Sequence, residues 1–311
     1  MKKFFVVNLF ALSFATAFAG SFDLVLVTDS GSKNVKRFDG TTGAYLGAFG
    51  SGFFSNPQGI TIKSGVAHVL DVVGGGSGRV RKFNYSTGEY LGSVTVQGWF
   101  LGGFGCNLVI GSDNAYYITA SGAGGTTKSD MTTGAQLAVR ASGVERGIAQ
   151  GADGRLYVTG TNPILYSDVV GFAGFGGWPV GAVAPVSDPY QMVFVGGTRL
   201  ASANAGNDSV TSFTTGGSSL ATFSVDSLLD DPRALGLGHN NVLYAGGLVA
   251  GSTTNGQIVR MDAFTGDNLG VFGSGILQNP HSMAVQMAPE PGTMIAIAAG
   301  IGLLASRRRR S

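Results

Sequence analysis

The sequence repeats a short stretch that first occurs as Asp39-Gly-Thr-Thr-Gly-Ala-Tyr-Leu-Gly47. The same frame returns as Asn84-Tyr-Ser-Thr-Gly-Glu-Tyr-Leu-Gly92, Asp130-Met-Thr-Thr-Gly-Ala-Gln-Leu137 and Asp262-Ala-Phe-Thr-Gly-Asp-Asn-Leu-Gly270, with a looser copy around Thr215-Gly216. In each copy a Thr-Gly pair separates two runs in which apolar and polar residues alternate. Glycine adopts the positive φ that a tight hairpin requires, so the stretch predicts a β-hairpin that recurs along the chain.

A second landmark opens each unit. It is Asn or Asp followed by proline, which ends one strand and starts a turn because proline lacks an N–H group and fixes φ. The landmark occurs at Asn56-Pro57, Asp188-Pro189, Asp231-Pro232 and Asn279-Pro280, with degenerate copies at Cys106-Asn107 and Arg146-Gly147. Pro57 and Pro280 are 223 residues apart. Over five intervals this gives a repeat of about 45 residues.

Four short strands fit into each unit. In the second unit we expect them at Ile60–Ile62, His68–Asp71, Arg79–Asn84 and Glu89–Val96. Four strands in about 45 residues is the pattern of a β-propeller blade, whereas the units of a solenoid are shorter. The sequence therefore predicts an all-β body, a propeller of six four-stranded blades.

The ends of the body predict how the ring closes. The first unit begins at its second strand, Leu24–Thr28, and the last unit ends with a surplus strand that starts at Pro280. If these two strands pair, the C-terminal strand completes blade one and no free sheet edge remains. The fourth unit, around Phe172–Val186, is the most degenerate, and an error in the blade count would arise there.

The blade starts resemble those of the NHL-type six-bladed propellers. The resemblance covers roughly residues 22–287 and is clear in the first, second and sixth units. It implies that the residue after the blade-start proline lies at the mouth of the central channel. Carried over to this sequence, that position forms a candidate ligand-binding ring of Gln58, Cys106, Arg146, Tyr190, Arg233 and His281.

The chemistry of this ring leaves two interpretations open. Two arginines, a tyrosine and a histidine would suit an anionic group such as a carboxylated sugar. Alternatively the ring is a solvated rim without a specific role. One histidine and no carboxylate in the ring argue against the chemistry of the lyases and lactonases among related propellers.

The composition supports strands and gives little sign of metal or cofactor chemistry. Charged residues are 12% of the chain, and glycine accounts for 52 of 311 residues. His68, His239 and His281 share no ligand spacing, so we predict no metal site and no cofactor. The stretch Asp226–Asp231 allows Ca²⁺, but the end of a short helical turn is the simpler interpretation. Cys106 is the sole cysteine, which we expect to be a small buried residue.

The first 19 residues have the pattern of a secretion signal. Lys2 and Lys3 form a positive start, Phe4–Phe18 is apolar, and Ala17-Phe18-Ala19 is a small-x-small cleavage site. We therefore divide the chain into a signal peptide (1–19), a propeller body (20–288) and a C-terminal tail (289–311).

The tail resembles the PEP-CTERM sorting signal of Gram-negative bacteria. Its parts are the sorting motif Pro289, Glu290 and Pro291, an apolar stretch over 293–305, and the membrane stop Arg307, Arg308, Arg309 and Arg310. By the positive-inside rule the arginines would stay on the cytoplasmic side. The resemblance implies processing by an exosortase-type enzyme in the inner membrane.

The two ends also explain the net charge. They hold six of the 20 basic residues and one of the 18 acidic residues, so the body carries 14 basic and 17 acidic residues, a net charge of −3. The basic character of the chain comes from its targeting segments, so we predict no nucleic-acid partner.

Together these features predict an exported, non-catalytic β-propeller with a monomeric body. It would be anchored transiently in the inner membrane, then displayed at the cell surface or in the extracellular polysaccharide matrix, where it binds polysaccharide or protein through one face. Aromatic residues expected in loops, Trp99-Phe100 and 172–178, could stack on sugar rings. The alternative is a secreted lyase or lactonase-like enzyme with its site at the channel mouth.

Overall fold

The computed structural model describes residues 22–74, 77–97, 107–120, 125–140, 145–160, 164–169, 178–182 and 186–287. The predicted signal peptide, the predicted tail, Cys106 and the Trp99-Phe100 pair lie outside these ranges. The described chain is almost entirely β-strand, with one short 3-10 helix, η2 (His239–Asn241). Within these ranges, none of the helices has the length and apolar character needed to span a bilayer.

The strands form six four-stranded antiparallel sheets, numbered here from the N-terminus. Sheet 1 has the order β24-β1-β2-β3, and each of the other sheets consists of four strands consecutive in the chain. The bounds are, for sheet 1, β24 (Pro280–Met287), β1 (Asp23–Asp29), β2 (Asn34–Asp39) and β3 (Tyr45–Phe49); for sheet 2, β4 (Pro57–Lys63), β5 (Val66–Gly74), β6 (Ser77–Asn84) and β7 (Tyr90–Gln97); for sheet 3, β8 (Leu108–Ile110), β9 (Ala115–Thr119), β10 (Thr126–Asp130) and β11 (Gln136–Arg140). They continue, for sheet 4, with β12 (Glu145–Gln150), β13 (Arg155–Gly160), β14 (Ile164–Val169) and β15 (Trp178–Ala182); for sheet 5, with β16 (Pro189–Gly196), β17 (Arg199–Asn204), β18 (Ser209–Thr214) and β19 (Ser219–Ser224); and for sheet 6, with β20 (Leu229–Leu237), β21 (Val242–Val249), β22 (Gly256–Asp262) and β23 (Asn268–Leu277).

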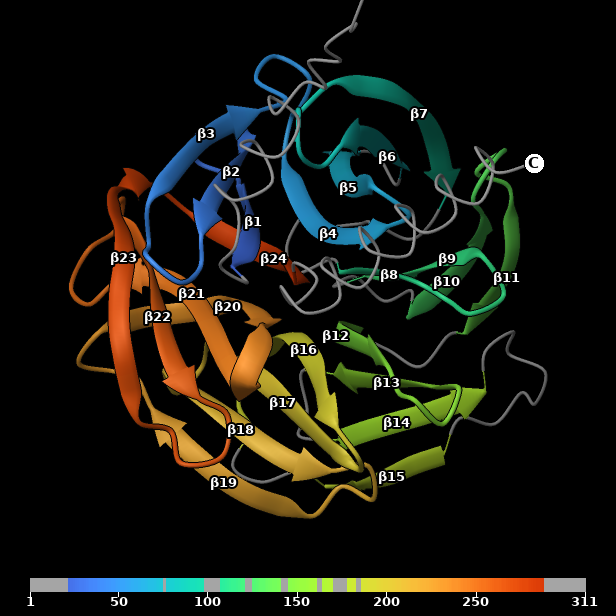
Figure 1. Cartoon of the computed structure of the whole chain (residues 1–311). Coiled ribbons are helices and arrows are strands. Elements are labelled where there is room, and N and C mark those ends of the chain that lie inside the picture. Colours follow the sequence, from blue (N-terminus) through green and yellow to red (C-terminus); the bar gives the residue numbers. More distant parts are fainter. Residues whose placement is uncertain are drawn as a thin grey trace, which may run out of the picture.

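The sheets stand around a central channel like the blades of a propeller (Figure 1). The innermost strands, β4, β8, β12, β16, β20 and β24, contact one another in turn around the channel. The prediction of an all-β propeller is confirmed. The predicted closure is confirmed as well, because β24 pairs with β1 and places Leu24 opposite Gln286 and Thr28 opposite Ser282.

The core is divided among six apolar clusters, and each cluster lies between two neighbouring sheets. Between sheets 6 and 1, for example, Val25 and Phe38 pack with Ile258 and Met283. Because both faces of a sheet are covered by neighbours, strands such as β1 are buried along nearly their whole length. Removal of this apolar surface from water holds the ring together.

The Thr-Gly turns join each sheet to the one before it. A Cβ added at Gly88 in sheet 2 would lie 2.5 Å from the Cβ of Phe49 in sheet 1. The turns of sheets 1, 3 and 6 fit equally closely, at Gly43 on Phe272, Gly134 on the Thr95 carbonyl and Gly266 on Phe223. Glycine is therefore required in these turns for two reasons: it adopts the positive φ, and it leaves room for the neighbouring sheet.

Basic side chains tighten the same joints. Lys82 on β6 donates to the carbonyl of Met131 in the turn of sheet 3, over 3.0 Å. Arg37 makes the equivalent bond to the carbonyl of Ser86, and Arg260 reaches across the closure to the carbonyls of Gly40 and Thr41. Each of these residues stands two positions before the Asp or Asn that begins a Thr-Gly turn. The repeat therefore encodes the contact between sheets as well as the hairpin.

The Leu of the repeat marks a β-bulge on the outermost strands. The register with the neighbouring strand shifts there, so that one leucine on the outer strand has no opposite partner. These exposed leucines are Leu46, Leu91, Leu137, Leu220 and Leu269. The outermost strand β15 also has a register shift, opposite Leu165 and Tyr166 of β14. A bulge bends an exposed edge and hinders its pairing with another chain.

Three details of the sequence analysis are wrong. A turn closed on the Val225 carbonyl ends at Leu229, but Asp230 and Asp231 already lie within strand β20, where Asp230 pairs with Leu248 of β21 and Asp231 falls in a register shift. Trp178 begins strand β15 instead of lying in a loop. In the looser copy of the repeat, the positive φ falls on Gly217 and not on Gly216, since the inserted residue moves the turn by one position.

Candidate functional site

Four residues of the predicted ring meet at one end of the channel. Arg146, Tyr190 and His281 are the second residues of the innermost strands β12, β16 and β24, and Arg233 lies in the middle of the innermost strand β20. They occupy the same position in four neighbouring sheets, so the ring symmetry brings together residues up to 135 positions apart in the sequence. We call this cluster the mouth.

Two guanidinium groups of the mouth lie over the ring of Tyr190. The Cζ atom of Arg146 lies 4.7 Å and that of Arg233 lies 4.9 Å from the centroid of Tyr190. His281 meets the same ring edge to face at 5.8 Å. Burial raises the pKa of the Tyr190 phenol, so the ring stays neutral and presents its π-face to both cations.

The prediction of a mouth without carboxylates needs correction, because two aspartates lie beside the arginines. Asp188 forms an ion pair with Arg146 at 2.6 Å, and Asp231 receives two hydrogen bonds from Arg233. Both aspartates directly precede the blade-start prolines and adopt a positive φ, at 47° and 53°. The sequence analysis interprets these Asp-Pro pairs only as turns. Only for Asp231 does the sequence carry a signal of the ion pair, because Arg233 follows it by two positions.

His281 is the most deeply buried group of the mouth. Its exposed fraction is 2%, and neither ring nitrogen has a hydrogen-bond partner. Burial, together with the charges of Arg233 and Arg146, lowers its pKa to about 3. The imidazole is therefore neutral at physiological pH, and it offers one donor and one acceptor that the protein leaves unused.

Two further positions of the predicted ring are Gln58 and Cys106. Gln58 is buried, and its backbone carbonyl accepts a hydrogen bond of 2.6 Å from the Thr28 hydroxyl. Cys106 lies outside the described residues. Since Gln58, Tyr190 and His281 are all buried, this part of the ring is not the solvated rim of the alternative interpretation.

Polar side chains cross the channel directly behind the mouth. The Gln191 amide donates to the Met283 carbonyl at 2.6 Å and accepts from the backbone N–H groups of Leu235 and Met283. Asn107 donates to the Arg146 carbonyl at 3.3 Å and accepts from the Ser282 hydroxyl at 3.1 Å. We call Asn107, Gln191 and Ser282 the plug, because they bind the innermost strands of sheets 1, 3, 4, 5 and 6 to one another.

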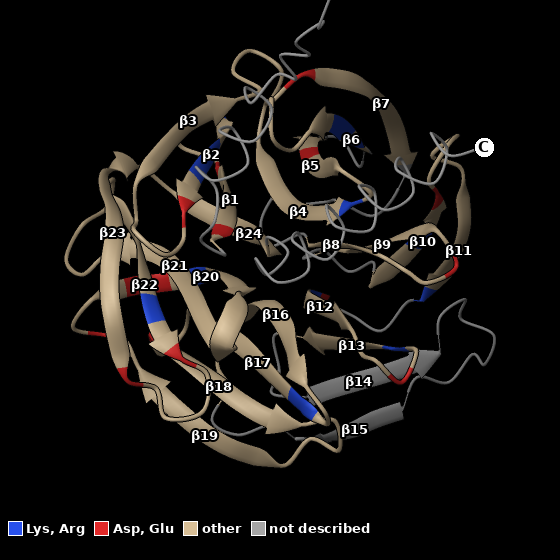
Figure 2. Ribbon diagram, in the orientation of Figure 1, with Lys and Arg blue, Asp and Glu red and all other residues tan. Residues whose placement is uncertain are grey.

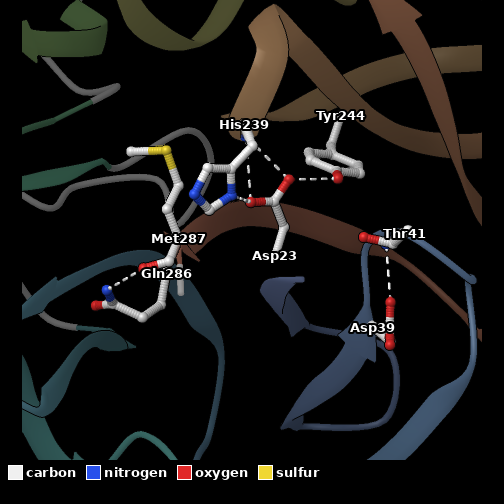
Figure 3. A network of polar contacts seen from close by, with 7 residues as sticks. All are labelled: Asp23, Asp39, Thr41, His239, Tyr244, Gln286 and Met287. Atoms are coloured by element: carbon white, nitrogen blue, oxygen red, sulfur yellow. Dashed lines mark hydrogen bonds and ion pairs between the residues drawn. The ribbon is translucent and has the colours of Figure 1, made fainter. Parts of the chain in front are cut away.

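A second polar network lies at the closure of the ring, away from the mouth (Figure 3). Asp23 on β1 accepts from the Tyr244 hydroxyl at 2.7 Å and contacts Nδ1 of His239 at 2.6 Å. The same Asp–Tyr bond occurs within sheet 3 between Asp113 and Tyr117, and within sheet 4 between Asp153 and Tyr157. A contact that recurs in three sheets is structural, and in sheet 6 the carboxylate comes from the neighbouring sheet.

The third histidine also has a polar partner. His68 on β5 is buried, and its Nδ1 lies 2.8 Å from the Tyr116 hydroxyl. Among the residues that the structure describes, no three His, Cys, Asp or Glu side chains gather in a way that would hold a metal ion. Charged residues are few on the coloured ribbon and scattered around the whole ring (Figure 2).

Comparisons with known proteins agree with the fold. The chain is similar to one in the crystal structure of a nidogen/laminin complex, with a TM-score of 0.65 and 14% identity over 85% of this chain and 98% of that one. It is also similar to a protein of unknown function from Bacteroides caccae, with a TM-score of 0.62 and 12% identity over 86% and 99% of the two chains. No protein-family model and no curated protein matches the sequence. At these identities the likeness shows a β-propeller fold alone.

Proposed function

We propose that this chain is an exported, non-catalytic binding protein whose six sheets are the blades of one closed propeller. The mouth binds an acidic polysaccharide at the cell surface or in the extracellular matrix. The observation that carries this proposal is the cluster of Arg146, Tyr190, Arg233 and His281, in which a fully buried imidazole keeps both nitrogens unpaired beside two cations.

The two arginines have different parts in this proposal. Arg233 donates two hydrogen bonds to Asp231, two residues away on the same strand, so this pair is a fixed support for Tyr190. Arg146 pairs with Asp188, whose side chain is 40% exposed. An exposed ion pair contributes little stability, so a carboxylate of the ligand can replace Asp188 as the partner of Arg146.

The ends of the body indicate which face is presented. Asp23 pairs with Met287, so the first described strand begins, and the last one ends, on the side of the ring opposite the mouth. The signal peptide and the sorting tail proposed from the sequence precede and follow these two residues. A body held at the membrane by its tail would therefore turn the mouth outward, toward the matrix.

The test is calorimetric titration of the full chain with polygalacturonate and alginate, with neutral dextran as the reference polymer. We expect saturable binding of the acidic polymers and at least tenfold weaker binding by the Arg146→Gln variant. Arg79→Gln is the matched control, because Arg79 is exposed on β6. Equal affinities of the two variants for the acidic polymers would show that the mouth does not bind them. Failure of both acidic polymers to bind would overturn the polysaccharide ligand and leave a protein partner as the next hypothesis.

The likeness to a chain from a nidogen/laminin complex gives that second ligand class its support, since this propeller fold occurs in an assembly of two proteins. Arg146→Gln separates the two classes as well. If the ligand is a protein that binds at the mouth, it should bind the Arg146→Gln variant more weakly, and neither dextran nor alginate should bind to the chain.

A further inference from the structure

A cavity of about 350 Å³ lies in the channel on the other side of the plug. The plug residues Asn107 and Gln191 form its closed upper end. Gln286 and Met287 lie at its open lower end, where Met287 is 46% exposed. The plug separates this cavity from the mouth, so the two ends of the channel are independent sites. Cavities of this volume lie within the range of ligand pockets in proteins.

The lining of the cavity is mostly main chain. Each sheet contributes consecutive residues of its innermost strand, such as Ile60, Thr61 and Ile62 of sheet 2. Their large apolar side chains belong to the clusters between sheets, which contain Ile60, Leu108, Ile148, Met192, Leu235 and Met283. What such strands present to the channel is their free edge, because each innermost strand is paired on one side only.

A free strand edge carries N–H and C=O groups that need partners when they are buried. Above the cavity, the plug supplies partners for several of them, including the N–H and C=O groups of Met283. Below the plug, the side-chain amides of Gln150 and Gln286 add further donors and acceptors. Within the part of the chain that the structure describes, no charged side chain lines the cavity.

We propose that this cavity binds an uncharged, polyhydroxylated ligand, such as a neutral sugar residue. Hydroxyl groups both donate and accept, so they match a ring of alternating peptide N–H and C=O groups. An apolar ligand would leave these groups unpaired, and a charged ligand would lose its hydration without a counter-charge.

The experiment titrates the full chain with D-glucose and maltose, and with D-glucuronate as a charged probe of the same ring size. In the Arg146→Gln variant, which removes the carboxylate partner proposed for the mouth, calorimetry and saturation-transfer NMR should show saturable binding of a neutral sugar, with glucuronate at least tenfold weaker. Gln150→Leu and Gln286→Leu should each weaken sugar binding at least tenfold. Gln136→Leu is the matched control on the exposed outermost strand β11 and should leave binding unchanged.

A measurement on the wild-type chain tests the proposal even if the substituted variants fold poorly. Hydrogen exchange of amides in β12, β16, β20 and β24 should slow when glucose or maltose is added, while β3 and β7 are unaffected. Absence of saturable binding by both neutral sugars, equal binding of glucuronate, or protection elsewhere in the ring would overturn the proposal. Arg146→Gln should leave sugar binding intact, so this result is separable from the fate of the mouth.

Discussion

The joints between sheets and the mouth of the channel are built from the same repeat in opposite ways. At the joints, equivalent residues do the same work in sheet after sheet: Gly88 on Phe49 repeats as Gly266 on Phe223. At the mouth, the equivalent position changes from each described sheet to the next, as Arg146, Tyr190, Arg233 and His281 show. Repetition accompanies contacts that hold the ring, and divergence accompanies the groups that can recognise a ligand.

The two regions also differ in how their polar groups are satisfied. In the turns at the joints, a carboxylate or amide accepts from nearby backbone N–H groups, as Asp39 does from Thr41 at 2.8 Å and from Thr42 at 2.9 Å. At the mouth, Arg233 is paired but His281 is not. Variants that alter each region therefore test whether stability and binding are separable in this molecule.

The largest loss of stability is expected at a joint. Gly88→Ala should reduce the free energy of unfolding by about 3 kcal/mol, since the new methyl group is both strained at positive φ and forced against Phe49. Gly65 has a similar φ of 82° but no atom within 4 Å of an added Cβ. Gly65→Ala should therefore cost only about 1 kcal/mol. Chemical denaturation of both variants measures the difference, and equal losses would show that the joint contact is unimportant.

The next effect is the response of the mouth to acid. The pKa of His281 is lowered to about 3 and that of His68 to about 4, both chiefly by burial. Below about pH 6.5 the unfolded chain binds protons that the folded chain does not, so stability falls as the pH is lowered toward those values. The slope is at most about 1.4 kcal/mol per pH unit for each histidine.

His281→Phe removes one of these two contributions. Denaturation of the variant at pH 7, 6 and 5 should show a shallower loss of stability than in the wild type. Parallel curves for the two proteins would contradict the neutral, buried state of His281.

A smaller loss is expected when the aromatic ring of the mouth is removed. Tyr190→Leu should cost about 1–2 kcal/mol, because two guanidinium groups lose their contact with the ring while the site stays filled. Thermal unfolding measures this loss. Acidic-polymer affinity should fall in the same variant by more than stability alone explains, and unchanged affinity would place ligand binding elsewhere.

The smallest effect is expected on the outermost strands. Leu91→Ser should change stability by less than about 0.5 kcal/mol, because Leu91 is exposed on a bulge and buries little apolar surface. Its measured contrast with Gly88→Ala, three residues earlier in the same repeat, separates the part of the motif that packs from the part that faces solvent. A loss as large as that of Gly88→Ala would place Leu91 in a contact with another molecule or sheet.

Much of the fold could be predicted from particular residues. The Thr-Gly turns and the Asn/Asp-Pro pairs each define backbone geometry locally, so the strands between them follow from the chain itself. The surplus strand after Pro280 also predicted its own pairing with β1, because closure needs only a unit that starts late and one that ends late. The strands of sheet 4 were hardest to foresee, since Phe172–Val186 lacks both landmarks.

The sequence by itself determined the period of the repeat and the closure of the ring, because these depend on turn residues close together in the chain. Only the tertiary structure decided that Asp188 neutralises Arg146 at the channel mouth, that Asn107 and Gln191 divide the channel, and that Asp23 completes a contact in sheet 6. These contacts join residues from different sheets. Their geometry depends on how the sheets meet around the axis, which no local pattern specifies.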